Sequence, residues 1–294
     1  MLTAVKSTIG KTRPNLSEEE KQHIHKLYFE EGKSTREISE NLGLNQTTIP
    51  KVIKRMTGKS VRKYAGNINY FDAIDTRAKA YFLGFIAADG CIVDNSRISR
   101  TDTLSINIHN RDTDILEKFR QELNREQELY IFIDKSQVGI RINHQHICDS
   151  LRQHGLDYRK SMTLENIYPL IPTQYWGAFT QGYFEGDGYI SPNKSPNQGT
   201  KSKKIYKFAT IGFCGTRNFL HGLAVAANLQ RYSFSFSPGH GVNSEKLQTG
   251  IFVLSFASKA EVNRIFTFMY SDADFVMNRK YSKFLPYIED SILS

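Results

Sequence analysis

Cysteines are few in this sequence and long apolar runs are missing, and both features exclude classes of protein. Three cysteines, Cys91, Cys148 and Cys214, stand far apart without a Cys-x-x-Cys pair, so the pattern indicates neither a disulfide framework nor a zinc site. No apolar stretch is long enough to cross a bilayer, and residues 1–15 lack the apolar core of a signal peptide. We therefore expect a cytoplasmic protein, and we leave open an association with the nucleoid or an origin in a phage or an organelle.

Acidic residues are fewer than basic ones. The 294 residues include 39 Lys and Arg against 30 Asp and Glu, which gives a formal net charge of +9. An excess of this kind usually neutralises phosphates. Because the sequence offers no membrane-spanning segment, the charge indicates a nucleic acid rather than a lipid surface as the partner.

Two stretches of the chain match each other. Residues 81–90 read YFLGFIAADG and residues 179–188 read FTQGYFEGDG, so that Asp89 is matched by Asp187. Each stretch is a largely apolar run of helical length that ends in Asp-Gly. One copy alone would indicate only the C-terminal turn of a helix. Two copies half a domain apart predict a pseudo-symmetric pair of units.

The small residues in each copy predict how the two helices pack. Gly84 and Gly182, one turn into the apolar run, allow another backbone to approach closely, and the glycines that end the copies are expected to leave the helix in the left-handed conformation. Two such helices packed side by side bring Asp89 and Asp187 together at one end of the seam. The unsatisfied carbonyls there favour a cation.

Aligned on these positions, residues 82–90 and 180–188 resemble the signature of the LAGLIDADG homing endonucleases. In that family the acidic residue at the eighth position binds the metal, and both copies keep it as Asp89 and Asp187. The sixth position, often acidic in the family, is Ala87 in the first copy and Glu185 in the second. The resemblance therefore implies that both metal-binding ends are intact.

The resemblance also implies the fold. We expect an α+β protein in which residues 70–168 and 169–290 each form an α-β-β-α-β-β-α half, with two antiparallel sheets that form a saddle along the major groove of DNA. Periodicity in the sequence favours this order. The predicted strands are 103–109, 129–134, 138–143, 204–214, 232–237 and 251–256, and the predicted helices after the motifs are 112–123, 144–154, 218–228 and 259–270.

A small all-α domain precedes the two halves. After a flexible basic arm over residues 1–15, residues 16–57 contain a capping box and three short amphipathic segments that resemble a helix-turn-helix. Pro50 is expected to lie deeper than the first turn of the third helix, where it would shorten or shift that helix. A helical packing module with a solvated face is the alternative. The residues predicted to face the major groove are Gln46, Thr47, Thr48, Lys51, Lys54 and Arg55.

Further basic residues are candidates for DNA contact. Residues 58–69 read as a basic linker that follows phosphates, or else as a solvated tether. A loop expected over residues 191–204 is rich in turn formers and lysines; it either clasps phosphates or is an ordinary surface loop. The candidates in these segments and on the strands are Arg62, Lys63, Arg141, Lys194, Lys201, Lys203, Lys204 and Lys207, with Asn107, His109, Asn143 and Thr210 as further outward-facing strand residues.

A second repeated feature follows the last helix of each half. Arg159-Lys160 and Arg279-Lys280 stand at equivalent places. A basic pair at a helix end is favourable by itself. In the family a lysine at this position of each half reaches toward the active site, so the resemblance implies Lys160 and Lys280 as catalytic residues beside Asp89 and Asp187.

The resemblance implies a site-specific endonuclease. Two or more Mg²⁺ ions held by Asp89, Asp187 and the main-chain carbonyls of Ala88 and Gly186 would support phosphodiester hydrolysis. We expect a monomer that makes a double-strand break with 3′ overhangs in a long, non-palindromic DNA target, encoded within an intron or free-standing. An inactive DNA-binding regulator and an RNA-splicing maturase are the alternatives. A recombinase or histidine-metal nuclease is disfavoured because His109, His144 and His146 match no such motif.

Overall fold

The computed structural model describes residues 16–31, 33, 35–45, 47–57, 66–95, 101–125, 128–196, 205–236 and 250–288, without the side chains of 194–196 and 205–206. The chain divides into two units, one of residues 1–68 with 117–128 and the other of residues 69–116 with 129–294. No helix among the described residues has the length and apolar character to cross a membrane. The expected arm over residues 1–15 and most of the expected linker lie outside the described residues.

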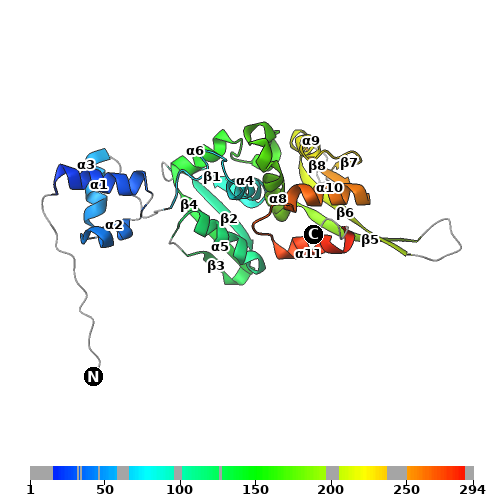
Figure 1. Ribbon diagram of the computed structural model, residues 1–294, viewed down its shortest axis with the longest axis horizontal. Helices are drawn as coiled ribbons and strands as arrows, with labels where there is room; N and C mark the ends of the chain where they lie inside the picture. The colour runs from blue at the N-terminus through cyan, green and yellow to red at the C-terminus, as the bar shows by residue number, and fades with distance from the viewer. Residues whose placement is uncertain are drawn as a thin grey trace, which may run out of the picture. The chain divides into compact units, whose positions relative to one another are not determined.

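The first unit contains the three predicted short helices. They are α1 (Glu18–Phe29), α2 (Thr35–Leu42) and α3 (Thr48–Thr57) (Figure 1). The capping box of α1 is present: the Glu20 amide donates to the Ser17 hydroxyl at 3.1 Å, and the Ser17 amide donates to the Glu20 carboxylate at 2.9 Å. The three helices share one apolar core, formed by Leu16, Ile24, Leu27, Ile38, Leu44, Ile49, Val52 and Ile53.

Pro50 lies in the first turn of α3 and not deeper in the helix as predicted. The helix begins at Thr48, so Pro50 is its third residue and lies within the first turn. The amides of the first turn have no partner inside the helix, and a proline there removes no hydrogen bond. The prediction that Pro50 lies deeper than the first turn is wrong, because α3 begins at Thr48.

The remainder of the chain repeats one order of elements, as predicted. Each half runs α-β-β-α-β-β-α and builds a four-stranded antiparallel sheet, with strand orders β1-β2-β4-β3 and β5-β6-β8-β7. The first half consists of α4 (Arg77–Asp89), β1 (Gly90–Val93), β2 (Thr103–His109), α5 (Thr113–Glu122), β3 (Tyr130–Phe132), β4 (Gln137–Asn143) and α6 (Gln145–Gln153). The second consists of α8 (Trp176–Asp187), β5 (Tyr189–Pro196), β6 (Ile205–Thr216), α9 (Arg217–Ala226), β7 (Ser233–Phe236), β8 (Ile251–Phe256) and α10 (Lys259–Tyr270).

The strands that leave the two motif helices were not among those predicted. β1 starts at Gly90, immediately after α4, and β5 starts at Tyr189, one residue after α8. The loop expected over residues 191–204 is therefore wrong in its first part, because residues 191–196 belong to β5. Pro192 and Pro196 are tolerated since β5 is an edge strand that pairs only with β6.

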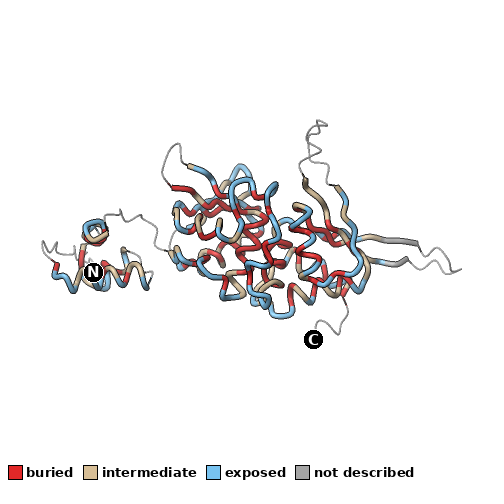
Figure 2. The backbone as a smooth tube through the Cα atoms, turned by 90° about the horizontal axis from the view of Figure 1, so that it is seen from above, coloured by how far each residue is buried: buried red, intermediate tan, exposed pale blue. Residues whose placement is uncertain are grey.

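Alternation along the strands buries one face of each sheet. In the first sheet Leu104, Ile106 and Ile108 on β2 are buried, and so are Val138, Ile140 and Ile142 on β4. The alternate residues point to the other face, where Asn107, His109, Arg141 and Asn143 are exposed. Figure 2 shows the buried residues gathered along the middle of the two-sheet body, where the motif helices run. Among the described residues, this arrangement leaves the first sheet with one exposed, polar face, as expected.

The two motif helices pack directly against each other. A methyl group on Gly84 would overlap the carbonyl oxygen of Phe179, and one on Gly182 would overlap the carbonyl oxygen of Tyr81. The two contacts are related by the pseudo-symmetry of the repeat. The crossing point has room only for glycine at these two positions. The predicted close approach of the helices is therefore confirmed.

Candidate active site at the motif seam

The two motif aspartates end their helices in the same way. Asp89 is the last residue of α4 and Asp187 the last residue of α8. The glycines that follow are extended, with φ of −79° at Gly90 and −72° at Gly188, so the predicted left-handed exit is wrong. These glycines are required for space: a Cβ on Gly90 would lie 2.8 Å from the Ile86 carbonyl oxygen, and one on Gly188 would lie 2.7 Å from that of Phe184.

The seam brings the ends of the two helices together. A Cβ on Gly186 would overlap the Cβ of Ala88 and lie 3.1 Å from Oδ2 of Asp89. The two carboxylates are close enough for the charge of Asp187 to raise the pKa of Asp89. Asp89 is half-buried and Asp187 remains accessible to solvent. Both acids can therefore be reached by a ligand from outside.

Lys160 reaches this site from the first half. It is the first residue of the short helix α7 (Lys160–Thr163), directly after Arg159, which takes a left-handed conformation with φ of 58°. Its side chain is buried, and Nζ donates to the carbonyl oxygen of Ala88 at 2.9 Å. A lysine predicted from its position in the repeat thus lies beside the motif acids.

Lys280 reaches the site from the second half and makes more contacts. It lies in the first turn of α11 (Asn278–Phe284) and is equally buried. Nζ donates to the carbonyl oxygens of Phe184, Gly186 and Gly188 at 2.8, 2.6 and 2.7 Å. The Ala88 and Gly186 carbonyls, which precede the two motif acids, are therefore each bound by the lysine of their own half.

Burial shifts the pKa values of the two acids and of the two lysines in opposite senses. Burial and then the charge of Asp187 raise the pKa of Asp89 to about 6, although Lys280 and Lys160 counteract this. Desolvation by the surrounding protein likewise raises the pKa of Asp187. Burial lowers the pKa of Lys160, and burial with the charge of Arg279 lowers that of Lys280 to about 8. Such opposed shifts in one cluster are typical of catalytic sites.

The donor set fits a hard divalent cation. The charge of Asp187 raises the pKa of Asp89, and a cation between the two carboxylates would favour the ionised form of both. The Ala88 and Gly186 carbonyl oxygens keep a second lone pair after accepting from the lysines. No cluster of three or more His, Cys, Asp or Glu occurs among the residues that the structure describes. The remaining ligands would have to be water and phosphate oxygens, which is how Mg²⁺ is usually bound.

Two long-range polar contacts near the site were not predicted from the sequence. Arg279 forms a two-pronged ion pair with Asp112 in the short 3-10 helix η1 (Asn110–Asp112) of the first half, with distances of 3.1 and 3.0 Å. Glu185 at the sixth motif position is buried and accepts a 2.6 Å hydrogen bond from the Tyr81 hydroxyl. Their partners are 167 and 104 residues away, and no local pattern signals them.

Most strand residues predicted to face outward do so. Asn107, His109, Arg141 and Asn143 are exposed on the free face of the first sheet, and Thr210 is half-exposed on β6. Lys207 is also exposed, but alternation places it on the face that carries Ala209 and Ile211. Lys207, predicted as an outward-facing candidate, is therefore exposed on the opposite face of β6 from Thr210.

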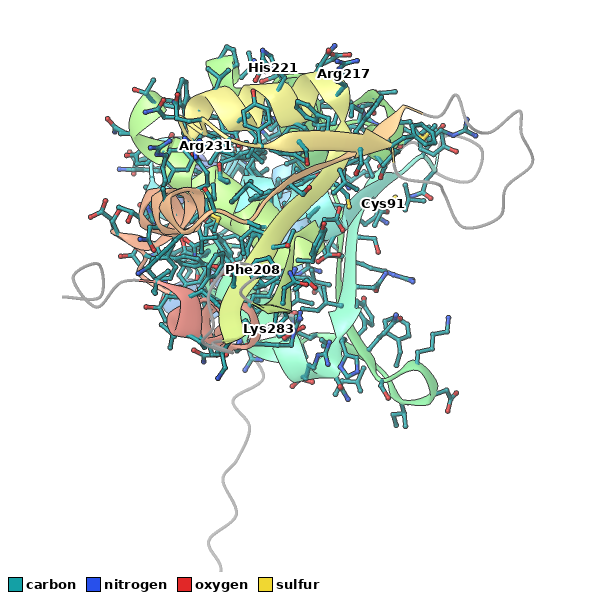
Figure 3. The ribbon with its side chains drawn as sticks, turned by 90° about the vertical axis from the view of Figure 1, so that its right-hand side faces the viewer. Cys91, Phe208, Arg217, His221, Arg231 and Lys283 are labelled. Carbon is teal, nitrogen blue, oxygen red and sulfur yellow. The ribbon has the colours of Figure 1, made fainter. Side chains whose placement is uncertain are left out.

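The positions right after the motifs differ between the halves. Cys91 on β1 is exposed and labelled in Figure 3. Its counterpart Tyr189 lies over Gly212, where a Cβ would be 2.5 Å from the tyrosine hydroxyl oxygen. Each half thus presents a different side chain beside its carboxylate.

The other basic candidates fall into two groups. On α3 and just before it, Thr47, Lys51, Lys54 and Arg55 are exposed and Thr48 is half-exposed, opposite the buried Ile49, Val52 and Ile53. The residues that lie outside the described part of the chain are Gln46, Arg62, Lys63, Lys201, Lys203 and Lys204, together with the side chain of Lys194 on β5. DNA contact by any of these residues stays a prediction.

Comparison with known proteins gives similarity in fold. No protein-family model and no curated protein sequence matches the chain. The fold is similar to that of the meganuclease I-SmaMI bound to uncleaveable DNA, with 9% identity over 71% of this chain and 87% of that chain and a TM-score of 0.47. It is also similar to the LAGLIDADG meganuclease I-AabMI bound to uncleaved DNA (11%, 71% and 88%, TM-score 0.48) and to the I-LtrWI LAGLIDADG homing endonuclease bound to target DNA (10%, 77% and 95%, TM-score 0.45). At these identities the likeness concerns the fold alone.

Proposed function

We propose that this protein is a site-specific DNA endonuclease that makes a metal-dependent double-strand break. One observation carries the proposal: Asp89, Asp187, Lys160 and Lys280 meet at the seam of two pseudo-symmetric halves, with the acids accessible and the lysines buried. Hydrolysis of a phosphodiester requires a positioned water and stabilisation of negative charge on the phosphate. Carboxylates and ammonium groups in this arrangement supply both requirements.

The residues of the site have separate roles in this mechanism. Asp89 and Asp187, with the carbonyl oxygens of Ala88 and Gly186, would hold Mg²⁺, which when bound lowers the pKa of a water and neutralises charge on the phosphate. The ammonium groups of Lys160 and Lys280 hold those carbonyls in place and favour the ionised form of the two acids. Their positive charge also favours a phosphate at the accessible side of the site.

The DNA partner is supported by charge and by exposed polar surface. The net charge of +9 favours a polyanion. The free face of the first sheet carries Asn107, His109 and Arg141, side chains that suit base edges and phosphates. Since both halves lie in one chain and differ in these residues, the target need not be palindromic and a monomer suffices.

The three-helix domain is proposed as a second DNA-binding element. Lys51, Lys54 and Arg55 are exposed on α3, and α3 itself contains no acidic residue. A helix with one buried apolar face and one basic face suits the major groove. On this proposal the domain adds affinity and sequence selection to the two-sheet body.

Cleavage of a randomised-site DNA library with Mg²⁺ tests the proposed function. The wild type is expected to produce defined double-strand ends, from which the target is read. Asp89→Asn and Asp187→Asn are each expected to reduce cleavage by at least about 100-fold without loss of binding, because each removes an anionic metal ligand. Asp134→Asn, in an exposed turn, serves as the control and should cut normally.

The opposite outcome has a definite meaning. If the wild type binds defined sites but never cuts them with Mg²⁺ or Mn²⁺, the endonuclease assignment is wrong. The protein would then be a DNA-binding regulator built on the same fold.

A further inference from the structure

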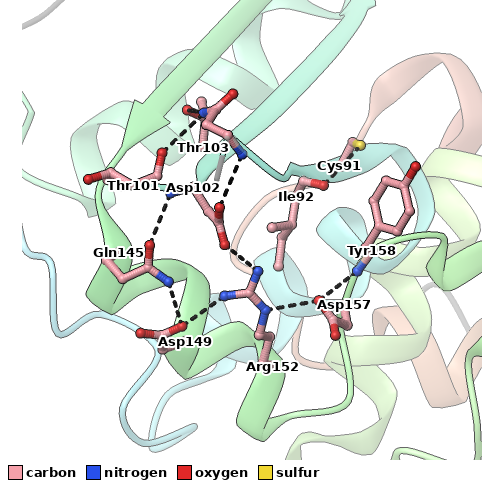
Figure 4. A network of polar contacts seen from close by, with 11 residues as sticks. Cys91, Ile92, Thr101, Asp102, Thr103, Gln145, Asp149, Arg152, Asp157 and Tyr158 are labelled. Carbon is pink, nitrogen blue, oxygen red and sulfur yellow. Dashed lines mark hydrogen bonds and ion pairs between the residues drawn. The ribbon is translucent and has the colours of Figure 1, made fainter. Parts of the chain in front are cut away.

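The two lysine-bearing segments are held by different ion pairs. In the first half, Arg152 on α6 contacts Asp157, three residues before Lys160, through Nε at 2.9 Å, and Asp149 through Nη1 at 2.8 Å (Figure 4). It also pairs with Asp102 at the start of β2. All of these ion-paired residues belong to the first half. The end of α7 also contacts the second half, where the Thr216 hydroxyl on β6 donates to the Leu164 carbonyl.

Lys280 is supported by the other half. Its neighbour Arg279 donates from Nε and Nη2 to the two carboxylate oxygens of Asp112, at 3.1 and 3.0 Å. Asp112 is 6% exposed and lies in the first half, just after β2. Two parallel hydrogen bonds fix a guanidinium in orientation as well as in position.

The sequence counterpart of Arg279 makes no such bond to any residue that the structure describes. Arg159 is exposed, and its guanidinium lies over the ring of Tyr158 at 5.1 Å. The Arg-Lys pair is therefore symmetric in sequence and asymmetric in structure. An exposed arginine stacked on an exposed tyrosine costs little to replace, which makes Arg159 a matched control.

Fixing Arg279 fixes the position of Lys280. The two residues are adjacent in the first turn of α11, where the Lys280 amide donates to the Met277 carbonyl at 2.9 Å and Arg279 also contacts the Met277 sulfur at 3.4 Å. Lys280 must align with three carbonyl oxygens. A shift of this turn would break that alignment.

The pair also balances charge at the site. The charged groups that face Lys280 are Arg279, Asp89, Asp187 and Glu185, and the charge of Asp112 acts on Asp89. Asp112 also forms a longer ion pair with Arg111 at 3.8 Å. Loss of Arg279 therefore leaves Asp112 with this weaker partner, and loss of Asp112 leaves the positive charge of Arg279 beside Lys280 without its bidentate partner.

We propose that the Arg279–Asp112 pair is a positioning device across the two halves, which holds Lys280 in place and makes the two cleavage events separable. This inference rests on the proposed endonuclease function. The turn that carries Lys280 is anchored to the first half through this bidentate ion pair, whereas Arg159 beside Lys160 forms no equivalent pair with any residue that the structure describes. Breaking the pair should slow cleavage of one DNA strand and turn the protein into a nicking enzyme.

Strand-resolved cleavage of a supercoiled plasmid that carries the target tests the proposal. Arg279→Gln is expected to accumulate nicked plasmid, with one strand cut at least about 10-fold more slowly, the range of effects for residues that orient catalytic groups. Arg159→Gln is expected to give linear product like the wild type. The exchange Asp112→Arg with Arg279→Asp should restore cutting of the slow strand, because the pair is re-formed in reverse.

A second readout does not depend on cleavage. Brief labelling with an amine reagent, followed by mass spectrometry, reports how accessible each lysine is. In Arg279→Gln the labelling of Lys280 should rise several-fold while that of Lys160 stays constant; the exchange variant should return Lys280 to the wild-type level. Thermal unfolding shows whether Arg279→Gln is folded. If it is not, the proposal is tested by the exchange variant alone.

The outcomes separate this inference from the proposed function. If the wild type does not cut DNA but Lys280 is selectively unmasked in Arg279→Gln, the positioning role stands and the endonuclease assignment fails. If Arg279→Gln labels like the wild type, slows both strands equally, or cuts both strands normally, the positioning role is overturned. Failure of the exchange to restore either readout also overturns it.

Discussion

The two halves agree where the helices cross and differ in what surrounds the crossing. Gly84 and Gly182 each meet the main chain of the opposite helix, and each lysine binds the carbonyl that precedes its own motif acid. The number of main-chain contacts made by the two lysines is not symmetric. Lys160 binds one carbonyl and Lys280 binds three. The comparison teaches that the seam is constrained by close packing, whereas the supports of the two lysines have been free to diverge.

The sixth motif position shows the same divergence. Ala87 is buried without a polar group, whereas Glu185 is buried with the hydroxyl of Tyr81 at 2.6 Å and the amide of Gln181 at 3.3 Å. Burial raises the pKa of Glu185, and its hydrogen bonds counteract that effect. A buried carboxyl is tolerated only with such partners. The second half therefore carries a polar network that the first half does without.

The strongest test of the symmetry is at the crossing glycines. Gly84→Ala and Gly182→Ala each place a methyl group against the partner helix's backbone, which can yield only if the helices separate. Each is expected to lower the free energy of unfolding by more than about 3 kcal/mol, and by similar amounts. Urea unfolding followed by circular dichroism measures both. Tolerance of either substitution would contradict the close packing.

A matched control isolates the effect of packing from that of helix propensity. Val225→Ala on α9 changes a residue that is 64% exposed and favours the helix slightly. It should leave the free energy of unfolding within about 0.5 kcal/mol of the wild type.

Asymmetry of the lysines predicts unequal costs of removing them. Lys280→Met leaves three main-chain oxygens without a charged donor, and Lys160→Met leaves one. A hydrogen bond to a charged group contributes more to stability than a neutral one. We therefore expect the free energy of unfolding to fall by about 2–3 kcal/mol in Lys280→Met and by about 1 kcal/mol in Lys160→Met. Both side chains have similar volume to Met, which limits cavity effects. Thermal unfolding of the two variants side by side decides, and equal losses would show that Lys280 gains nothing from its extra contacts.

Much of the fold follows from local sequence pattern. The strands predicted over 103–109 and 251–256 and the helix over 259–270 match β2, β8 and α10, because alternation and helical spacing are strong there. β1 and β5 were missed for physical reasons. β1 has four residues and begins with the glycine that ends α4, and β5 contains two prolines, which read as a turn unless the strand is known to lie at an edge.

The site was predictable only as far as the repeat reaches. Asp89, Asp187, Lys160 and Lys280 could be named because each has a counterpart at an equivalent place in the other half. The extended exits at Gly90 and Gly188 could not, because glycine permits several conformations and tertiary packing selects among them. Asp112 has no counterpart that acts in the same way. Asp112 pairs with Arg279, which is 167 residues away in the sequence. A contact of this kind forms only when the two halves pack together, so no local sequence pattern predicts it.

The smallest expected effect concerns the cost of holding two acids together. The folded-state pKa of Asp89 is raised from 3.8 to about 6, so between these values the folded state binds more protons than the unfolded state. The free energy of unfolding of the metal-free protein should therefore fall as pH rises through this window, and the full decrease is reached at pH 7.

Asp89→Asn removes this destabilisation but also removes the attraction of Asp89 to the lysines. We expect the free energy of unfolding at pH 7 to rise by about 1 kcal/mol in this variant. Mg²⁺ should stabilise the wild type more than the variant, because the variant lacks the negative charge of Asp89 that would bind the cation. Unfolding curves at pH 5 and pH 7, with and without Mg²⁺, measure all three effects, and a variant that is less stable than the wild type at pH 7 without metal would show that the lysines already compensate the two acids in full.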